Sequence, residues 1–353
     1  MKNPFIKLLV RVIAYIGISV TVILLVGYLI LMIFSPHMLK FSSGIDVIHI
    51  NTNLEELPGA AFISVPNGCE NIYLDQNSEK IYVTTLEGYI YLLDRNTNDS
   101  FAIIKSIHPG AMSLGIDQGP DGNLYVAVSQ YEYDGWKHTG GSVYKVDSGL
   151  DSAEKITGDY QGINGLAFDK SGNLYFASSN MHILRPKGFI YKMQPEGSDH
   201  FASPKVFLKM KELLNGLSFN REWDQLVFST TVGGVYAFIP GSNLYDVVYM
   251  KMKFMEITDD LCTDIGGNIW MSDPGNSTIK MFNPGTKRLT RFYIDDIGQT
   301  SSCRIRSENN LEMLYITELK QMQVPTSKIY DGRGILMIPA QSLLGLTKDY
   351  SDK

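Results

Sequence analysis

Residues 162–179 read Gly-Ile-Asn-Gly-Leu-Ala-Phe-Asp-Lys-Ser-Gly-Asn-Leu-Tyr-Phe-Ala-Ser-Ser, and they contain the full pattern of a β-hairpin. An alternating apolar run with Leu166 and Phe168 leads into the turn sequence Asp-Lys-Ser-Gly-Asn at 169–173, and a second run follows it. Two period-two runs joined by a turn rich in Gly, Asn and Asp are typical of paired antiparallel strands. The first strand of this hairpin starts at an asparagine, Asn164.

The same hairpin pattern recurs along the chain. Each copy has one aromatic or apolar residue just after its turn, and these residues are Tyr82, Tyr125, Tyr175, Val227, Trp270 and Tyr315. Their spacings of 43, 50, 52, 43 and 45 residues are the length of one propeller blade of four strands. The sequence therefore predicts an all-β fold, a six-bladed β-propeller, without a second globular domain.

Composition excludes several classes of function. The 353 residues carry a net charge of −6, and no run rich in Lys and Arg occurs outside the N-terminus, so nucleic-acid binding is not expected. The three cysteines, Cys69, Cys262 and Cys303, are too few for a disulfide framework. Each lies in or beside an apolar run, so we expect all three to be small buried hydrophobic residues.

The N-terminus predicts a membrane anchor. Residues 12–34 contain no charge and are long enough to cross a bilayer as a helix. A cleaved signal peptide is the alternative, but this apolar run is longer than the apolar core of a typical signal peptide. Lys2, Lys7 and Arg11 precede the run, which places the N-terminus in the cytoplasm and the propeller outside it, in a periplasm, a lumen or the cell exterior.

The remaining boundaries follow from the repeats. We expect a cytoplasmic N-terminus at 1–11, a transmembrane signal anchor at 12–34, a linker with a strand at 35–59, the propeller at 60–345 and a C-terminal tail at 346–353. The strand at 46–50 is predicted to pair with the last blade and close the ring. Three insertions, at 131–140, 181–187 and 320–332, are expected to be loops on one face.

Four blades begin with an oxygen-bearing side chain at the same phase of the repeat. In a propeller these positions face one another across the central channel, and they hold Glu70, Asn164, Asn215 and Asp259. Two carboxylates and two amides form an all-oxygen ligand set that suits Ca²⁺, with another divalent metal as the alternative. Taken singly, an Asn or Asp before a Gly is usually a turn former. Four of them at one phase predict a metal site at the propeller axis.

The chain resembles the regucalcin/gluconolactonase family of six-bladed propellers, which is related to diisopropyl-fluorophosphatase, paraoxonase and strictosidine-synthase-like proteins. The resemblance covers about residues 60–340 and is carried by Cys69-Glu70, Asn164-Gly165, Asn215-Gly216-Leu217-Ser218-Phe219, the segment 259–270, Thr300-Ser-Ser-Cys303 and the segments 313–317 and 332–338. It implies a calcium ion held by Glu70, Asn164, Asn215 and Asp259, and the hydrolysis of lactones or related esters.

The chemistry at such a site leaves two roles open for Asp259, as general base toward water or as direct nucleophile. Asp260, which replaces the glycine common in gluconolactonases, is either a fifth ligand or substrate contact, or a solvated loop carboxylate. His108 is a candidate proton shuttle at the start of the second blade, with a structural histidine as the alternative. His182 falls in a loop where gluconolactonases have an acidic substrate contact, and is a candidate for substrate binding.

Gluconolactonase-like members carry a sugar-gripping arginine two residues before the third-blade asparagine, and this chain has Gly162 there. We therefore expect a small, less polar lactone or an aryl ester as substrate. The competing hypothesis is a non-catalytic propeller that binds a ligand or a protein and holds calcium only for stability. A condensing enzyme of the strictosidine-synthase type ranks last, because no catalytic glutamate of that kind can be placed.

Overall fold

The computed structural model describes most of the chain after residue 44. The described residues are 15, 17, 19–27, 45–95, 100–130, 140–180, 187–197, 200–220, 225–231, 234–238, 245–250, 257–295, 297–308, 311–319 and 334–348. Residues 15, 17 and 19–27 of the predicted anchor at 12–34 are described, whereas most of the predicted loops at 131–140, 181–187 and 320–332, and His182, lie outside the described residues. Within the described part, no helix is long and apolar enough to cross a membrane.

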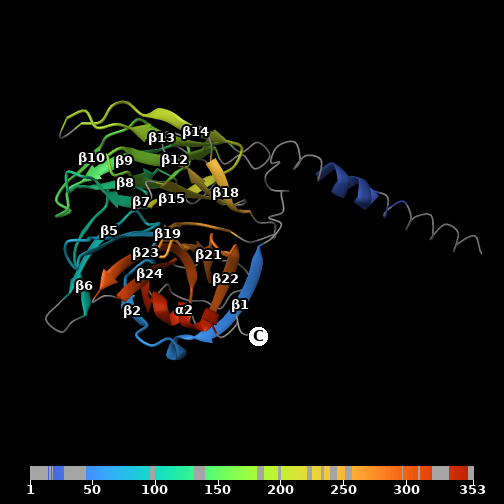
Figure 1. The fold of residues 1–353 in the computed structure, drawn as a ribbon. Coiled ribbons are helices and arrows are strands. Elements are labelled where there is room, and N and C mark those ends of the chain that lie inside the picture. Colours follow the sequence, from blue (N-terminus) through green and yellow to red (C-terminus); the bar gives the residue numbers. More distant parts are fainter. Residues whose placement is uncertain are drawn as a thin grey trace, which may run out of the picture.

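Six antiparallel sheets follow one another along the chain and are arranged around a common centre (Figure 1). Blades 1 to 3 are β3 (Asn71–Leu74), β4 (Ile81–Thr84), β5 (Ile90–Arg95) and β6 (Phe101–Ile107); β7 (Met112–Gln118), β8 (Leu124–Ser129), β9 (Gly141–Val146) and β10 (Ala153–Lys155); and β11 (Ile163–Phe168), β12 (Leu174–Asn180), β13 (Lys187–Met193) and β14 (Lys205–Met210). The six-bladed propeller predicted from the sequence is confirmed.

The other three blades complete the ring. They are β15 (Leu214–Asn220), β16 (Gln225–Thr230), β17 (Gly234–Phe238) and β18 (Tyr245–Met250); β19 (Leu261–Thr263), β20 (Ile269–Asp273), β21 (Thr278–Asn283), β22 (Arg288–Asp295) and the added β1 (Asp46–Asn53); and β23 (Gln299–Glu308), β24 (Leu311–Leu319), β25 (Gly334–Pro339) and β2 (Ala61–Ser64). The six repeat residues of the sequence all lie on the second strand of a blade and are almost fully buried.

The turn at 169–173 shows why this repeat folds as a hairpin. Asp169 accepts hydrogen bonds from the backbone N–H groups of Ser171 and Asn173 and from the Tyr175 hydroxyl. Gly172 has φ +78°, a conformation that costs glycine little. One aspartate thus fixes the turn and also satisfies the polar end of the buried aromatic ring, and Asp264 does the same for Trp270 in blade 5.

The prediction that residues 46–50 close the ring on the last blade is wrong. β1 pairs in parallel with β22, the outer strand of blade 5, from Asp46 beside Arg288 to Asn53 beside Asp295. The ring is closed by β2, which pairs with β25 and gives the sixth blade its outer strand. Between β1 and β2, a short 3₁₀ helix (Leu54–Glu56) carries the chain from one blade to the next.

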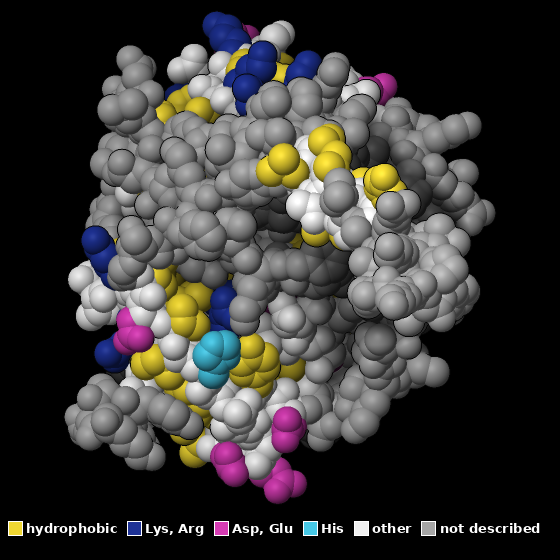
Figure 2. All heavy atoms as spheres, turned by 90° about the vertical axis from the view of Figure 1, so that its right-hand side faces the viewer, with side chains coloured by type: hydrophobic (Ala, Val, Ile, Leu, Met, Phe, Trp, Pro, Cys, Tyr) yellow, Lys and Arg dark blue, Asp and Glu magenta, His cyan; other side chains and the backbone are white. Residues whose placement is uncertain are grey.

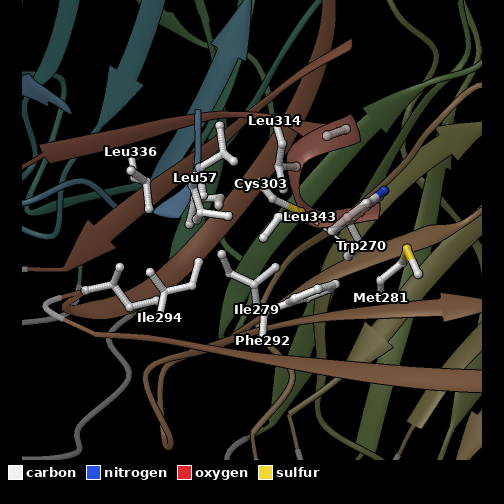
Figure 3. Close-up of a cluster of buried hydrophobic side chains, with 14 of the residues drawn as sticks. Leu57, Trp270, Ile279, Met281, Phe292, Ile294, Cys303, Leu314, Leu336 and Leu343 are labelled. Atoms are coloured by element: carbon white, nitrogen blue, oxygen red, sulfur yellow. Dashed lines mark hydrogen bonds between the residues drawn. The ribbon is translucent and has the colours of Figure 1, made fainter. Parts of the chain in front are cut away.

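The C-terminal part of the propeller is covered by a helix that the sequence pattern did not indicate. α2 (Ala340–Lys348) begins directly after β25 and extends past residue 345, the predicted end of the propeller. Its Ala340 and Leu343 are buried in one cluster with Leu57, Trp270 and residues of blades 5 and 6 (Figure 3). The helix therefore belongs to the propeller and packs over the region where the chain crosses between these blades.

On the face shown in Figure 2, several basic side chains gather at the upper edge, acidic side chains gather at the lower edge, and hydrophobic side chains lie between them among the described residues.

Candidate active site and metal centre

The innermost strands of the blades share one irregularity where they reach the central channel. In blades 2, 3, 4 and 6 the pairing with the second strand shifts register across two residues, which is a β-bulge. Blades 1 and 5 have two residues at the same point, which are Glu70 and Asn71 at the start of β3, and Asp259 and Asp260 directly before β19. The first residues of these pairs are Glu70, Leu114, Asn164, Asn215, Asp259 and Ser301, and we call this set the axial ring.

Two carboxylates of the axial ring meet at one serine. The Ser301 hydroxyl lies 2.8 Å from Glu70 Oε2 and 2.9 Å from Asp259 Oδ2. A hydroxyl has one proton, so it donates to one carboxylate at a time. Glu70 is buried, with 7% of its surface exposed, and Asp259 is partly buried. Blades 1, 5 and 6 therefore concentrate negative charge in a small volume that water solvates poorly.

Burial and this crowding raise the pKa of both carboxyl groups. Burial, and then the charge of Asp259, raise the pKa of Glu70 well above its usual range. Burial raises the pKa of Asp259 to about 7, the Asp260 charge adds to the rise, and hydrogen bonds from Ser301 and Asn215 oppose it. A cation bound beside these two neighbouring carboxyls would stabilise their ionised forms.

The amide members of the predicted ligand set lie on neighbouring blades. Asn215 on β15 hydrogen-bonds Asp259, so its amide reaches the carboxylate pair. Asn164 occupies the same ring position on β11, is half-buried, and makes no side-chain hydrogen bond to another described residue. Gly165, next to it, packs so closely on blade 4 that a Cβ would lie 2.5 Å from Asn215 O. The structure thus brings Glu70, Asn215 and Asp259 together and places Asn164 at the matching position.

The donor set fits a hard divalent cation. Among the described residues, no group of three or more His, Cys, Asp or Glu side chains is placed to hold a metal. The axial ring offers two carboxylates and two amides instead, and oxygen ligands of this kind suit Ca²⁺ better than a softer metal. The convergence of Glu70 and Asp259 on the Ser301 hydroxyl supports this fit, because a bound cation would offset the repulsion between the two carboxylates.

Of the roles that the sequence left open for Asp260, the structure excludes the solvated loop carboxylate, and the role as a fifth ligand or substrate contact stays a prediction, since Oδ1 is buried without a hydrogen-bond partner among the described residues. Its Oδ2 accepts hydrogen bonds from Asn71 (2.9 Å), Ser302 (2.6 Å) and Arg304 (2.7 Å), and its side chain is only 5% exposed. Arg304 also reaches Asn71 Oδ1 at 3.2 Å. Asp260 is therefore part of a buried ion pair one residue below the axial ring, which joins blades 1, 5 and 6, and it is not a solvated loop carboxylate.

His108 does not occupy the axial ring. The ring residue of blade 2 is Leu114, whereas His108 lies on the exposed connection between β6 and β7. Its Nε2 is 2.9 Å from Glu87 O, and its ring packs edge-on against Tyr89 with centroids 4.7 Å apart. These contacts match the structural alternative rather than a proton shuttle at the carboxylates. His182, the predicted substrate contact, lies outside the described residues.

Sequence reasoning missed Ser301 and a set of hydroxyls behind the ring. Each of these hydroxyls lies on the second strand of its blade. It accepts a hydrogen bond from a backbone N–H of the same blade, that of the residue directly after the axial-ring residue. It also donates a hydrogen bond to the backbone carbonyl of the axial-ring residue in the next blade. The set comprises Thr84, Ser229, Ser272 and Thr317. Blades 2 and 3 have Ala127 and Ala177 at this place. The signal in the sequence is a Ser or Thr near the end of the second strand in the other four blades.

Residues 163–320 match the family model described as SMP-30/Gluconolactonase/LRE-like region. The match covers somewhat less than half of the chain. The matched segment of the SMP-30/gluconolactonase/LRE-like region holds Asn164, Asn215 and Asp259, whereas Glu70 lies outside it and joins the site through the closure of the ring. The family resemblance predicted from the motifs is confirmed.

Solved structures of this family share the fold. Regucalcin from Agrobacterium tumefaciens, a calcium-binding protein, aligns with a TM-score of 0.61 at 12% identity over 83% of this chain and 95% of that chain. A gluconolactonase from Xanthomonas campestris gives 0.56 at 16% over 80% and 90%, and a luciferin-regenerating enzyme gives 0.60 at 14% over 80% and 95%. No curated protein matches the sequence. At these identities the likeness shows the propeller fold alone.

Proposed function

We propose that this protein is a calcium-dependent hydrolase of lactones or related esters, with its active site at the axial ring. The observation that carries the proposal is the convergence of Glu70 and Asp259 on one Ser301 hydroxyl at the propeller axis, with Asn215 bonded to Asp259. The names of the aligned structures, a gluconolactonase and a calcium-binding regucalcin, support the same class of chemistry.

The ligands of the ion would be Glu70, Asn164, Asn215 and Asp259. A calcium ion held there would act as a Lewis acid and polarise the carbonyl of a cyclic ester. Asp259 would either accept a proton from the attacking water or attack the carbonyl carbon itself. The Asn215 amide and the Ser301 hydroxyl orient the Asp259 carboxylate for either role.

The substrate is expected to be less polar than a sugar lactone. Gly162 stands where gluconolactonase-like members have an arginine, and its φ of +48° disfavours any other residue. A Cβ at this position would lie 2.3 Å from Ser179 O. A cationic side chain that grips sugar hydroxyls therefore cannot be accommodated there without moving the backbone of blade 3, and we propose small alkyl lactones and aryl esters.

The test compares ring variants with matched surface variants on a panel of lactones and aryl esters. We expect Asp259→Asn and Glu70→Gln to remain folded and to lose hydrolysis, whereas the exposed Asp151→Asn and Glu154→Gln keep it. EDTA should abolish the activity and calcium should restore it. Full activity in both ring variants would refute the metal-centred mechanism. A lower melting temperature with EDTA, without hydrolysis of any ester, would instead support the non-catalytic propeller.

A further inference from the structure

Two of the three cysteines lie side by side where blades 5 and 6 meet. Cys262 on β19 and Cys303 on β23 come from neighbouring inner strands, and their sulfur atoms are 3.1 Å apart. The Cys262 thiol donates to Cys303 Sγ, and the Cys303 thiol donates to Trp270 O at 3.4 Å. Figure 3 shows Cys303 close to Trp270 and Leu343 within the hydrophobic cluster of these blades. Both residues are free thiols in this structure.

The strands that carry the two thiols are held together just above them. Asp260 N donates to Ser301 O at 3.2 Å, and the Ser272 hydroxyl bonds both Asp260 N and Ser301 O. Arg304 adds a bond from β23 to Leu261 O. A disulfide has an S–S length of about 2.05 Å, so a sulfur displacement of about 1 Å converts this contact into a covalent bond. Side-chain rotation supplies a movement of that size.

A small reagent has a route to Cys262. A cavity of about 360 Å³ lies at the ends of the inner strands, and Cys262 lines it together with Arg304, Ala167, Ser218 and Tyr73. These residues follow the axial ring by three positions on their strands, so the cavity is at the end of the channel away from the carboxylate pair. Cys303 is 1% exposed and does not line this cavity, so a reagent in the cavity meets Cys262, which is 4% exposed, first.

We propose that Cys262 and Cys303 are a dithiol that closes to a disulfide on exposure to a small disulfide oxidant. The Cys262 thiolate attacks one sulfur of the oxidant, forming a mixed disulfide and releasing one thiolate. Cys303 then attacks the Cys262 sulfur and releases the second. Two electrons pass to the oxidant, and the two protons of the cysteine thiols go to the two released thiolates. The product ties blade 5 to blade 6.

The position of the bond gives it two consequences. It closes a loop between residues 262 and 303, which stabilises the folded state mainly by restricting the unfolded chain. It also lies three residues after Asp259 and two residues after Ser301, on the strands that hold this part of the axial ring. Cys69 is buried at the start of blade 1 and is left as the odd thiol.

The test needs no hydrolytic activity, so it is independent of the proposed function. The folded full-length protein is incubated with bis(2-hydroxyethyl) disulfide, or with dithiothreitol as the reduced control, then unfolded and alkylated. We expect three alkylated cysteines in the reduced sample and one, Cys69, in the oxidised sample, together with a linked peptide pair that contains Cys262 and Cys303. The oxidised sample should melt about 5 °C higher.

Three variants make the result specific. Cys262→Ala and Cys303→Ala should each give no protein disulfide and no rise in melting temperature, whereas Cys69→Ala should behave like the natural chain. If the two alanine variants fail to fold, the comparison of oxidised and reduced Cys69→Ala still shows whether the disulfide forms, because only Cys262 and Cys303 remain in that variant. Three alkylated cysteines after oxidation, or a linked pair that includes Cys69, would overturn the proposal.

Discussion

At the scale of single residues, the site depends on how closely two carboxylates are held. Glu70 and Asp259 share the Ser301 hydroxyl although they lie 189 positions apart in the sequence. The sequence allowed both to be predicted, because each precedes an inner strand at one phase of the repeat. Ser301 has the same phase, but a serine in a strand does not by itself indicate a functional residue. His108 was misplaced because no turn residue marks Leu114 as the ring position of blade 2.

The first prediction concerns the stability of the metal-free protein against pH. Burial raises the pKa of Asp259 from its usual 3.8 to about 7, and Glu70 shifts in the same direction. Between these two values Asp259 holds a proton in the folded chain that the unfolded chain releases, so this carboxyl makes the stability fall as pH rises from about 4 to about 7, and Glu70 acts in the same direction. Because Asp259 is only partly buried, solvent screening reduces the effect, and we expect a loss of about 2 kcal/mol.

Urea unfolding in EDTA at several pH values measures this loss. The Asp259→Asn variant lacks the carboxyl and should show a flatter profile over the same range. A natural protein whose stability falls no more than that of the variant would contradict the assignment of the raised pKa to Asp259.

The second prediction tests the role of Ser301. Its hydrogen bond lowers the pKa of Asp259 against the effect of burial, so Ser301→Ala should raise that pKa further. The titration of ¹³C-labelled carboxyl groups by NMR, in EDTA, gives the value directly. Ser218→Ala is the matched control, since Ser218 lies on the inner strand β15 but lines the cavity at the other end of the channel. An unchanged Asp259 titration in Ser301→Ala would show that the hydroxyl donates elsewhere.

At the scale of elements, hydroxyls on the second strands hold the axial ring in place. Ser272 on β20 accepts from Asp260 N in its own blade at 3.1 Å and donates to Ser301 O in the next blade. Thr317 on β24 does the same for Ser302 N at 2.7 Å and Glu70 O at 3.3 Å. Such bonds pass from blade to blade and align backbone atoms of the site. Sequence alone does not show them, because their partners are backbone atoms of a neighbouring repeat.

The third prediction follows from that bridging. Ser272→Ala leaves Asp260 N without this acceptor in a buried place and removes one link to Ser301, so it should destabilise the fold by about 1–3 kcal/mol. Ser78→Ala removes an exposed turn hydroxyl that donates to Asp75 and accepts from Lys80 N, and should change stability by less than about 0.5 kcal/mol. Urea unfolding measures both changes. Equal effects in the two variants would mean that the bridge contributes nothing.

The two N-terminal strands show what the repeat pattern could not decide. Residues 46–50 were recognised as a strand, but every blade has an outer edge, and the pattern does not say which edge a detached strand covers. The choice is made by packing: Ile50 and Leu57 are buried in one cluster with Phe292 and Ile294, and His49 stacks on Tyr293 with centroids 5.7 Å apart. β1 therefore covers blade 5, and β2 closes the ring.

The fourth prediction measures that packing. Ile50 is 1% exposed, so Ile50→Ala should destabilise the protein by about 2–4 kcal/mol. Val47 lies on the same strand with 41% of its surface exposed, and Val47→Ala should have an effect of less than about 0.5 kcal/mol. Thermal or urea unfolding distinguishes the two. A small effect at Ile50 would indicate that β1 is not attached to blade 5 in solution.

At the scale of the whole molecule, the repeat made the propeller predictable. The six buried residues of the second strands, from Tyr82 to Tyr315, gave the number and order of the blades, because each blade must bury the same face against its neighbours. The closure of the ring and α2 were not predictable in this way. Both break the period, and α2 follows β25 with a sequence, Ala-Gln-Ser-Leu-Leu-Gly-Leu-Thr-Lys, that contains glycine and has no strong start signal.

The fifth prediction concerns the compartment in which the ring would find calcium. The apolar run at 12–34 and the preceding charges Lys2, Lys7 and Arg11 predict that the N-terminus is cytoplasmic and that the propeller lies outside the cytoplasm. Two carboxylates form a ligand set of modest charge, which is sufficient where calcium is near millimolar. A reporter that works only in the cytoplasm should therefore be active when fused before Met1 and silent when fused after Lys353. The reverse pattern would refute the orientation, and it would leave the axial ring facing the low calcium of the cytoplasm, where a ligand set with only two carboxylates would stay largely empty.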